Sequence, residues 1–402
     1  MLQKLIRKIA YRRHPWRHMQ FDELAEIYTS MSLRSLGFSI VGIFIPIYLY
    51  ERGVELQSIF WLFSWIFLLR IPVAFVAAYV VGRAGPKHSI ALSTLLFILF
   101  LVMLLSFTTF NWPLVSLAAL FTISNGLFFI AYNTDFSKIK HSKHGGKELG
   151  WLYIFERIGG ALGPFIGGLL ASLARPEVTI VAAIAVLLGS LVPLFLTNEP
   201  VRLHQHITFR GFPWRRHVWD AVSLGAFNMD NISSLIWWPL FVAVTVFITG
   251  TYAKLGAVVA LAMGISIFSA YMFGKFIDGK RGRALLFYGV ITNASLHILR
   301  PFISTPAGVV AVSTANEPVT LSYRLPLFKA FYDAGDSEEG YRIVYMALTE
   351  MIGAFCKAVL CFSLYFAAYW AEAVTVLQWH FVVVGCISLG ILLQRFPALK
   401  KA

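Results

Sequence analysis

The chain has 402 residues, of which 58% are hydrophobic and only 13% charged, and its formal net charge at pH 7 is +14. Soluble globular domains carry about 25% charged residues, so this composition excludes a soluble enzyme or binding domain and indicates a membrane protein. The basic residues lie in short segments between apolar runs, which is typical of loops beside an anionic membrane surface and argues against nucleic-acid binding.

The first twenty residues contain no acidic residue and place Leu2, Leu5, Ile6 and Ile9 on one face of a helix. This pattern predicts a basic amphipathic segment on the inner leaflet, which we assign to residues 1–26. An Arg-rich organellar transit peptide is the alternative interpretation.

Twelve apolar runs follow, each long enough to cross about 30 Å of hydrocarbon, which takes roughly 20 residues of helix. They are long and continuously apolar, whereas strands of a membrane barrel are short and alternate in polarity, so helices are expected. The predicted spans are 27–50, 56–82, 88–108, 113–136, 149–173, 177–197, 219–246, 252–278, 284–303, 306–328, 343–366 and 373–394.

The segments between these spans differ strongly in charge. With the N-terminus inside, the inner segments hold 24 Lys and Arg residues, and the outer ones hold only Arg52 and Arg175. This asymmetry predicts that both termini are cytoplasmic. We therefore expect a multi-pass protein of the cell membrane, monomeric and surrounded by lipid, with no nucleic-acid partner.

The sequence contains a weak internal repeat. Asn125, Tyr132 and Lys138 recur 191 residues later as Asn316, Tyr323 and Lys329, and Pro46 recurs 193 residues later as Pro239. Two repeats in the same orientation place a shared cavity between them. The fold class predicted is an all-α membrane protein with twelve transmembrane helices as two parallel six-helix repeats. The predicted parts are segment 1–26, an N-terminal bundle 27–197, a linker 198–218, a C-terminal bundle 219–394 and a tail 395–402.

The stretch GWLYIFERIGGALGPFIGG at 150–168 is rich in residues that weaken helices. Gly159, Gly163 and Gly167 recur every four residues and form a groove where another helix backbone can approach closely. Pro164 removes one backbone hydrogen bond and bends the helix. The groove serves either close packing alone or a smooth surface on which the two halves slide.

Two motifs resemble those of the major facilitator superfamily. The turn GKFIDGKRGR resembles the family's first signature through Gly274, Asp278, Gly282 and Arg283. The matching turn in the first half keeps Arg83, Gly85 and Lys87, but Ala78 and Gly82 replace the family's Gly and Asp. The stretch 150–168 is similar to the antiporter signature at Gly150, Gly159, Gly163, Pro164, Gly167 and Gly168.

This resemblance implies a secondary transporter that works by alternating access and exports small organic or amphipathic compounds in exchange for protons. The family's fourth span usually carries an Arg that assists proton coupling, and the corresponding stretch 120–129 has none.

Ionisable side chains inside the spans are candidates for function, because each costs at least about 2.5–3.5 kcal/mol in the bilayer. Arg300, Lys254, Arg324 and Asp220 lie near span ends and are expected to snorkel or cap, and His297 and His380 to be interfacial. The deeper charged residues are Arg34, Arg70, Glu156, Asp230, Glu317, Glu350 and Lys357.

The resemblance also implies that the first, fourth, seventh and tenth spans line the cavity, so that Arg34, Asn125, Asp230 and Glu317 surround the substrate. Arg70 needs an acidic partner, for which Glu156 is our expectation. Buried acids beside bases can load and release protons, which makes Glu156, Glu350 and Asp230 candidates for coupling. The alternative is that these residues form static ion pairs that hold the helices together.

No hydrolytic motif, phosphate-binding loop or metal-ligand spacing occurs in the sequence, so we expect no enzymatic activity, no cofactor and no metal. The expected partners are a small-molecule substrate and protons. Two alternatives remain open. The protein transports organic anions through the basic Arg34, Arg70 and Lys357, or it is a membrane protein that retains the fold without transport.

Overall fold

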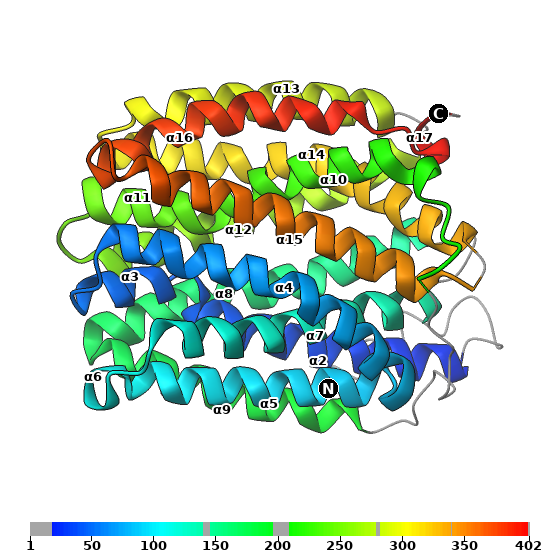
Figure 1. Ribbon diagram of the computed structural model, residues 1–402, viewed down its shortest axis with the longest axis horizontal. Coiled ribbons are helices and arrows are strands. Elements are labelled where there is room, and N and C mark those ends of the chain that lie inside the picture. Colours follow the sequence, from blue (N-terminus) through cyan, green and yellow to red (C-terminus); the bar gives the residue numbers. More distant parts are fainter. Residues whose placement is uncertain (1–17, 140–144, 196–208, 279–281, 339, 401–402) are drawn as a thin grey trace.

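The computed structural model describes residues 18–139, 145–195, 209–278, 282–338 and 340–400. Side-chain surroundings are described for all of these except residues 18–28, 136–139, 145–157, 270–271, 274–278, 336 and 400. Every regular element in the described ranges is helical, and the helices lie side by side in one bundle (Figure 1).

Twelve helical rods follow the twelve predicted spans in order. The first half contains α2 (His18–Gly42) with α3 (Ile45–Glu51), α4 (Leu56–Ala84), α5 (Pro86–Leu105), α7 (Leu114–Ile139), α8 (Gly145–Leu173) and α9 (Pro176–Leu194). The second half contains α10 (Trp214–Ile232) with the π-helix η2 (Ser233–Trp237) and α11 (Trp238–Thr245), α12 (Thr251–Asp278), α13 (Gly282–Leu299) with η3 (Arg300–Phe302), α14 (Pro306–Ser337), α15 (Arg342–Ala367), and α16 (Ala373–Ser388) with η4 (Leu389–Leu393). Two short helices, α6 (Phe107–Phe110) and α17 (Pro397–Lys400), lie outside the rods.

Eight stretches among the described residues are long and apolar enough to cross a membrane. They belong to the rods of α2 with α3, α4, α5, α7, α9, α12, α15 and α16. The rods of α8, α10, α13 and α14 are not among them, and in α8 the searched residues form only the shorter apolar helix Ile158–Leu173. The other three carry buried polar side chains such as Asp230, Asn293 and Asn316.

The helices pack in the same pattern in the two halves (Figure 1). The first rod contacts the fifth through α2 and α8, and the seventh contacts the eleventh through α10 and α15. The contacts of α5 with α7 and α9 recur as contacts of α13 with α14 and α16. Among the described helices, this correspondence agrees with the predicted repeat.

The repeat extends to the prolines matched in the sequence. Pro46 lies in the first turn of α3 and Pro239 in the first turn of α11. In both halves, the first rod is therefore interrupted just before its proline. A turn separates α2 from α3, and the π-helix η2 separates α10 from α11.

The glycine groove of α8 packs mainly inside its own half. A Cβ atom added at Gly159, Gly163 or Gly167 would overlap atoms of Ser32, Ser39 or Ile40 on α2. The expectation that these three glycines form the sliding surface between halves is therefore wrong, because they face α2. Close backbone packing explains them.

The adjacent face of α8 meets the other half. A Cβ at Gly168 would overlap the carbonyl oxygen of Tyr252, and one at Gly256 would overlap that of Pro164. The backbones of α8 and α12 thus touch with few side chains between them. The second long contact between the halves joins α4 and α15.

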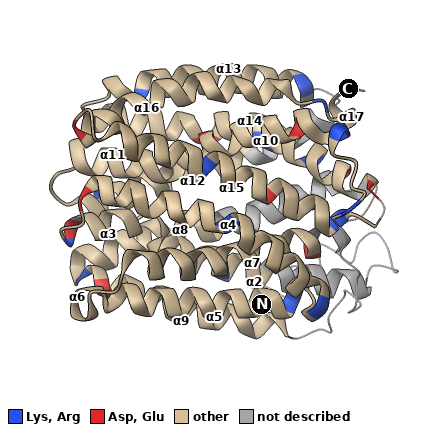
Figure 2. Cartoon of the chain, viewed as in Figure 1, with Lys and Arg blue, Asp and Glu red and all other residues tan. Residues whose placement is uncertain are grey.

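The two halves touch at both ends of the bundle. One end, here called the basic end, carries Arg83, Lys87, Arg210, Arg283, Arg342 and Arg395, and Figure 2 shows Lys and Arg gathered there beside the C-terminus. At this end the Tyr332 hydroxyl donates to Asn133 Oδ1 at 2.8 Å. At the opposite end the Tyr252 hydroxyl donates to Glu51 Oε2 at 2.7 Å.

Gly167→Ala should destabilise the protein by about 1–3 kcal/mol, because the added methyl group overlaps the Ile40 carbonyl in a tightly packed contact. Gly189→Ala is the matched control, since a Cβ at that helical glycine meets nothing within 4 Å. Thermal unfolding in detergent should show a lower midpoint for Gly167→Ala and an equal or higher one for the control. Equal midpoints for the two variants would contradict the close contact of α8 with α2.

Candidate functional site

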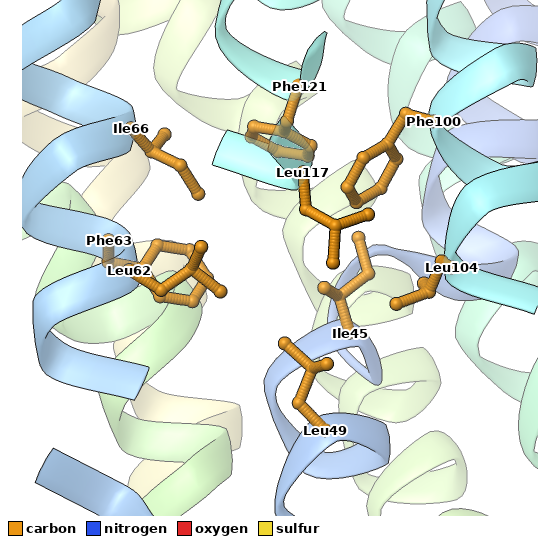
Figure 3. Close-up of a pocket in the computed structure, with 9 residues that line it drawn as sticks. All are labelled: Ile45, Leu49, Leu62, Phe63, Ile66, Phe100, Leu104, Leu117 and Phe121. Atoms are coloured by element: carbon orange, nitrogen blue, oxygen red, sulfur yellow. The ribbon is translucent and has the colours of Figure 1, made fainter. Parts of the chain in front are cut away.

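The cavities described in the structure do not mark a substrate site. Figure 3 shows an apolar pocket of only about 10 Å³ between α3, α4, α5 and α7, lined by Ile45, Leu49, Leu62, Phe63, Ile66, Phe100, Leu104, Leu117 and Phe121. A water molecule barely fits such a volume, so this is a packing defect. A larger groove, about 510 Å³, runs between α10, α15 and η4 and is also mostly apolar. The polar chemistry lies elsewhere, in buried clusters.

The first cluster surrounds Asp230 on α10, whose side chain is almost fully buried. Its Oδ1 accepts from Asn293 Nδ2 at 2.7 Å and pairs with His297 Nε2 at 2.6 Å. Its Oδ2 accepts from the Tyr323 hydroxyl at 2.5 Å. Because three groups on α13 and α14 hold one carboxylate of α10, the cluster ties these three helices together.

Arg300 in η3 extends the cluster. Its Nη1 lies 3.0 Å from His297 Nδ1, and its Nη2 donates to Asn316 Oδ1 at 2.8 Å and to Ser234 Oγ at 3.1 Å. A guanidinium only donates hydrogen bonds, so His297 Nδ1 must accept. The imidazole is therefore neutral with its proton on Nε2, and it bridges the Asp230 carboxylate and the Arg300 guanidinium.

This cluster is electrically balanced and sealed from solvent. Asn293, His297, Arg300 and Tyr323 all have exposed fractions of 0%. The Arg300 guanidinium also lies over the rings of Trp238 and Phe381, at 5.2 and 5.4 Å. Immediately after Asp230 the chain forms the π-helix η2, and such helices are frequent at functional sites.

The second cluster surrounds Arg34 on α2, which is 4% exposed. Its Nε donates to Thr94 Oγ1 on α5 at 3.2 Å, and its Cζ lies 3.4 Å from the ring centroid of Phe128 on α7. Its Nη2 is buried without a hydrogen-bond partner. Among the side chains that the structure describes, no carboxylate pairs with this guanidinium.

The third cluster joins the two halves. Arg70 Nε on α4 lies 2.5 Å from Glu350 Oε1 on α15, and the Arg70 guanidinium also lies over the Phe129 ring at 4.6 Å. Lys357 is buried, interacts electrostatically with both Glu350 and Arg70, and lies 5.1 Å from the ring centroid of Phe67. Glu350 from the other half is therefore an acidic partner of Arg70, while Glu156, the partner expected from the sequence, lies outside the described side chains.

Three expectations about depth are wrong. Arg300 does not snorkel and His297 is not interfacial, since both are fully buried beside Asp230. His380 is buried as well, next to the Phe381 ring. These three side chains thus belong to the interior of the second half.

Two residues near span ends bind backbone groups at those ends. The Asp220 carboxylate accepts a hydrogen bond from the backbone N–H of Arg395. The Lys254 ammonium donates to the carbonyl of Thr249. Both interactions fix the ends of helices and take no part in the buried clusters.

The remaining candidates are dispersed. Asn125 donates to the carbonyl of Phe121 on its own helix, and Glu317 interacts electrostatically with Arg300. Arg283 is exposed at the start of α13. Gly150, Glu156, Gly274 and Asp278 lie in helical segments at positions outside the described side chains. In the described parts of the chain, no group of three potential metal ligands is found.

Sequence reasoning missed four residues that complete the clusters: Thr94, Phe128, Asn293 and Tyr323. Asn293 and His297 are spaced four residues apart and so share one helix face, which is a signal that was present in the sequence. Nothing local distinguishes Thr94 or Phe128 from other residues of apolar spans.

The fold and the buried clusters define a multi-pass membrane protein made of two matched six-helix bundles. The sequence profile of the Major Facilitator Superfamily matches residues 27–316, so the chain belongs to this family. It is accordingly a secondary transporter by class, in a family that is generally non-enzymatic.

Solved structures agree on the fold. The chain is similar to a Major Facilitator Superfamily transporter, FucP, in the outward conformation, with 12% identity, 94% of this chain and 98% of that chain covered, and a TM-score of 0.65. It is also similar to a single-residue variant of the E. coli fucose:proton symporter, FucP, with 13% identity, coverages of 91% and 98%, and a TM-score of 0.61. No curated protein sequence matches the chain.

Glu350→Gln should destabilise the protein by about 3–5 kcal/mol, because it leaves the buried Arg70 and Lys357 facing each other without an acid. Arg52→Gln is the control, since it removes an ion pair with Glu177 that is about one-third exposed and worth at most about 1 kcal/mol. Thermal unfolding in detergent measures both. If Glu350→Gln unfolds no earlier than Arg52→Gln, the ion pair between the halves does not stabilise the protein.

Proposed function

We propose that the protein is a proton-coupled secondary transporter of the cell membrane that exports small organic compounds in exchange for protons. Bundles 27–197 and 219–394 are the moving parts, the linker 198–218 joins them, and both termini are cytoplasmic. The observation that carries this proposal is the buried pair of Asp230 and His297, held between a guanidinium and a phenol.

The pair is suited to proton loading because each change in protonation alters a specific hydrogen bond. A proton on Asp230 Oδ2 reverses the hydrogen bond to Tyr323, since the protonated oxygen then donates and the hydroxyl accepts. A proton on His297 Nδ1 requires Arg300 to leave that nitrogen. The first event alters the bond between α10 and α14, and the second breaks the bond between η3 and α13.

The helix α14 can carry this change to the interface between halves. It bears Tyr323 and Asn316, which bind Asp230 and Arg300, and also Tyr332, which bonds to Asn133 of the first half at the basic end. Protonation inside the second bundle and contact between the bundles thus share one helix. This linkage supports the coupling of proton binding to opening of the basic end.

Export in exchange for protons is the direction that the motif in α8 favours. Its face at Pro164 and Gly168 meets Gly256 and Tyr252 through backbone atoms, which leaves few interlocked side chains to separate when the halves rock. The similar E. coli protein is named as a symporter, so the direction of transport is proposed separately from proton coupling itself.

Asp230→Asn should abolish proton movement that accompanies transport, because the amide cannot take up the proton. The assay uses proteoliposomes with an internal pH-sensitive dye, to which the anionic probe benzenesulfonate or the cationic probe ethidium is added. Wild-type protein should move protons with at least one probe, and Asp230→Asn should fall below detection. Substrate exchange without a proton gradient should persist in this variant.

Glu55→Gln is the matched control, because it neutralises an exposed carboxylate at the start of α4 and should leave proton movement unchanged. Glu350→Gln and Glu156→Gln test the other two acids expected to carry protons. Unchanged proton movement in Asp230→Asn would place coupling elsewhere. Absence of any flux with wild-type protein would favour a membrane protein that retains the fold without transport.

A further inference from the structure

The internal repeat gives the two halves one equivalent polar position each. In the second half, Asp230 on α10 contacts residues of α13 and α14. In the first half, Arg34 on α2 contacts residues of α5 and α7, which are the repeat counterparts of α13 and α14. Arg34 and Asp230 are 196 residues apart and Pro46 and Pro239 of the same rods are 193 apart, so the two charged residues lie within about one helical turn of equivalent positions. The first rod of each half therefore turns one charged side chain toward its third and fourth rods.

The two side chains carry opposite charges and differ in the number of hydrogen-bond partners that they have. Asp230 has three hydrogen-bond partners and a cation within its own bundle. Arg34 has one acceptor, Thr94, and the face of a benzene ring, while Nη2 is buried without a partner. A buried cation without an acid is costly, and such residues in membrane spans mark ligand or ion sites.

The surroundings of Arg34 suit an anion with an apolar body. The rings of Phe128 and Phe129 lie 5.6 Å apart and connect Arg34, over the first ring, with Arg70, over the second. Arg70 and Lys357 provide two positive charges against the single negative charge of Glu350. The described side chains of this region therefore have a net positive charge before a ligand arrives.

We propose that Arg34 is the anchor of a binding site for a small organic anion, a carboxylate or sulfonate with an aromatic or aliphatic body. This inference rests on the proposed transport function, because it names the substrate class that the transporter carries. The Thr94 hydroxyl holds Nε and so orients the guanidinium, which leaves Nη2 to donate to the anion. In the first half, the ligand provides the negative charge. In the second half, the carboxylate of Asp230 provides it.

The first experiment measures binding to the purified full chain in detergent, with no membrane and no proton gradient. Benzenesulfonate, succinate and inorganic phosphate are the anionic probes, and benzenesulfonamide is the neutral match of the first. Benzenesulfonate should raise the thermal unfolding midpoint progressively as its concentration increases, and benzenesulfonamide should not. Equal effects of the sulfonate and the sulfonamide, or no binding of any anion, would overturn the proposal.

The second experiment compares variants by isothermal titration with benzenesulfonate. Arg34→Gln should weaken binding about 10- to 100-fold, as expected for loss of a charge-assisted hydrogen bond. Arg34→Lys, which keeps the charge, should retain part of the affinity, and the exposed-loop variant Arg175→Gln should bind like the wild type. If Arg34→Gln does not fold, Thr94→Val provides the test, because it removes the hydroxyl that orients the guanidinium and should weaken binding several-fold. Unchanged affinity in the folded Arg34 or Thr94 variant would exclude Arg34 as the anchor.

The anion site and the proton coupling can fail independently. Binding of benzenesulfonate without proton movement would keep the site and remove proton coupling. Proton movement with ethidium and no binding of any anion would keep the transporter and remove the site.

Discussion

The cost of a charge inside hydrocarbon is the constraint on which the rest of this structure depends. Each unpaired ionisable group at the centre of a membrane costs at least about 2.5–3.5 kcal/mol, so every such group needs a partner inside the bundle. The protein meets this demand in three ways. Asp230 and Arg300 balance each other through His297, Arg70 pairs with Glu350 across the halves, and Arg34 is covered by an aromatic ring.

These three solutions hold different parts together. The cluster at Asp230 makes α10, α13 and α14 one unit, so its hydrogen bonds are internal to the second bundle. The pair of Arg70 and Glu350 joins α4 to α15 and must separate when the halves part at that depth. Between α8 and α12 the contact is made by glycines and carbonyl groups, which can separate without breaking an ion pair. The boundary between bundles therefore combines one buried ion pair, between α4 and α15, with a smooth backbone contact between α8 and α12.

Much of the architecture could be predicted from the sequence, because span length and loop charge are local properties. The depth of the charged side chains and the identity of their partners could not be predicted in this way. Arg300 lies near the end of its span, yet its guanidinium points inward, where it donates to Ser234 of η2 and Asn316 of α14. The partner that the structure describes for Arg70 is Glu350, which lies 280 residues later in the chain. The spacing of residues along a helix tells which of them share a face, but it does not tell which helix that face meets.

The sequence by itself determined the helical membrane fold, the two repeats and the family resemblance, because hydropathy, charge asymmetry and motif spacing are written in consecutive residues. Only the tertiary structure decided that Asp230 has a complete set of partners and that Arg34, its counterpart, does not. That difference depends on side chains from three separate helices in each half, and the rotation and packing of those helices place them together.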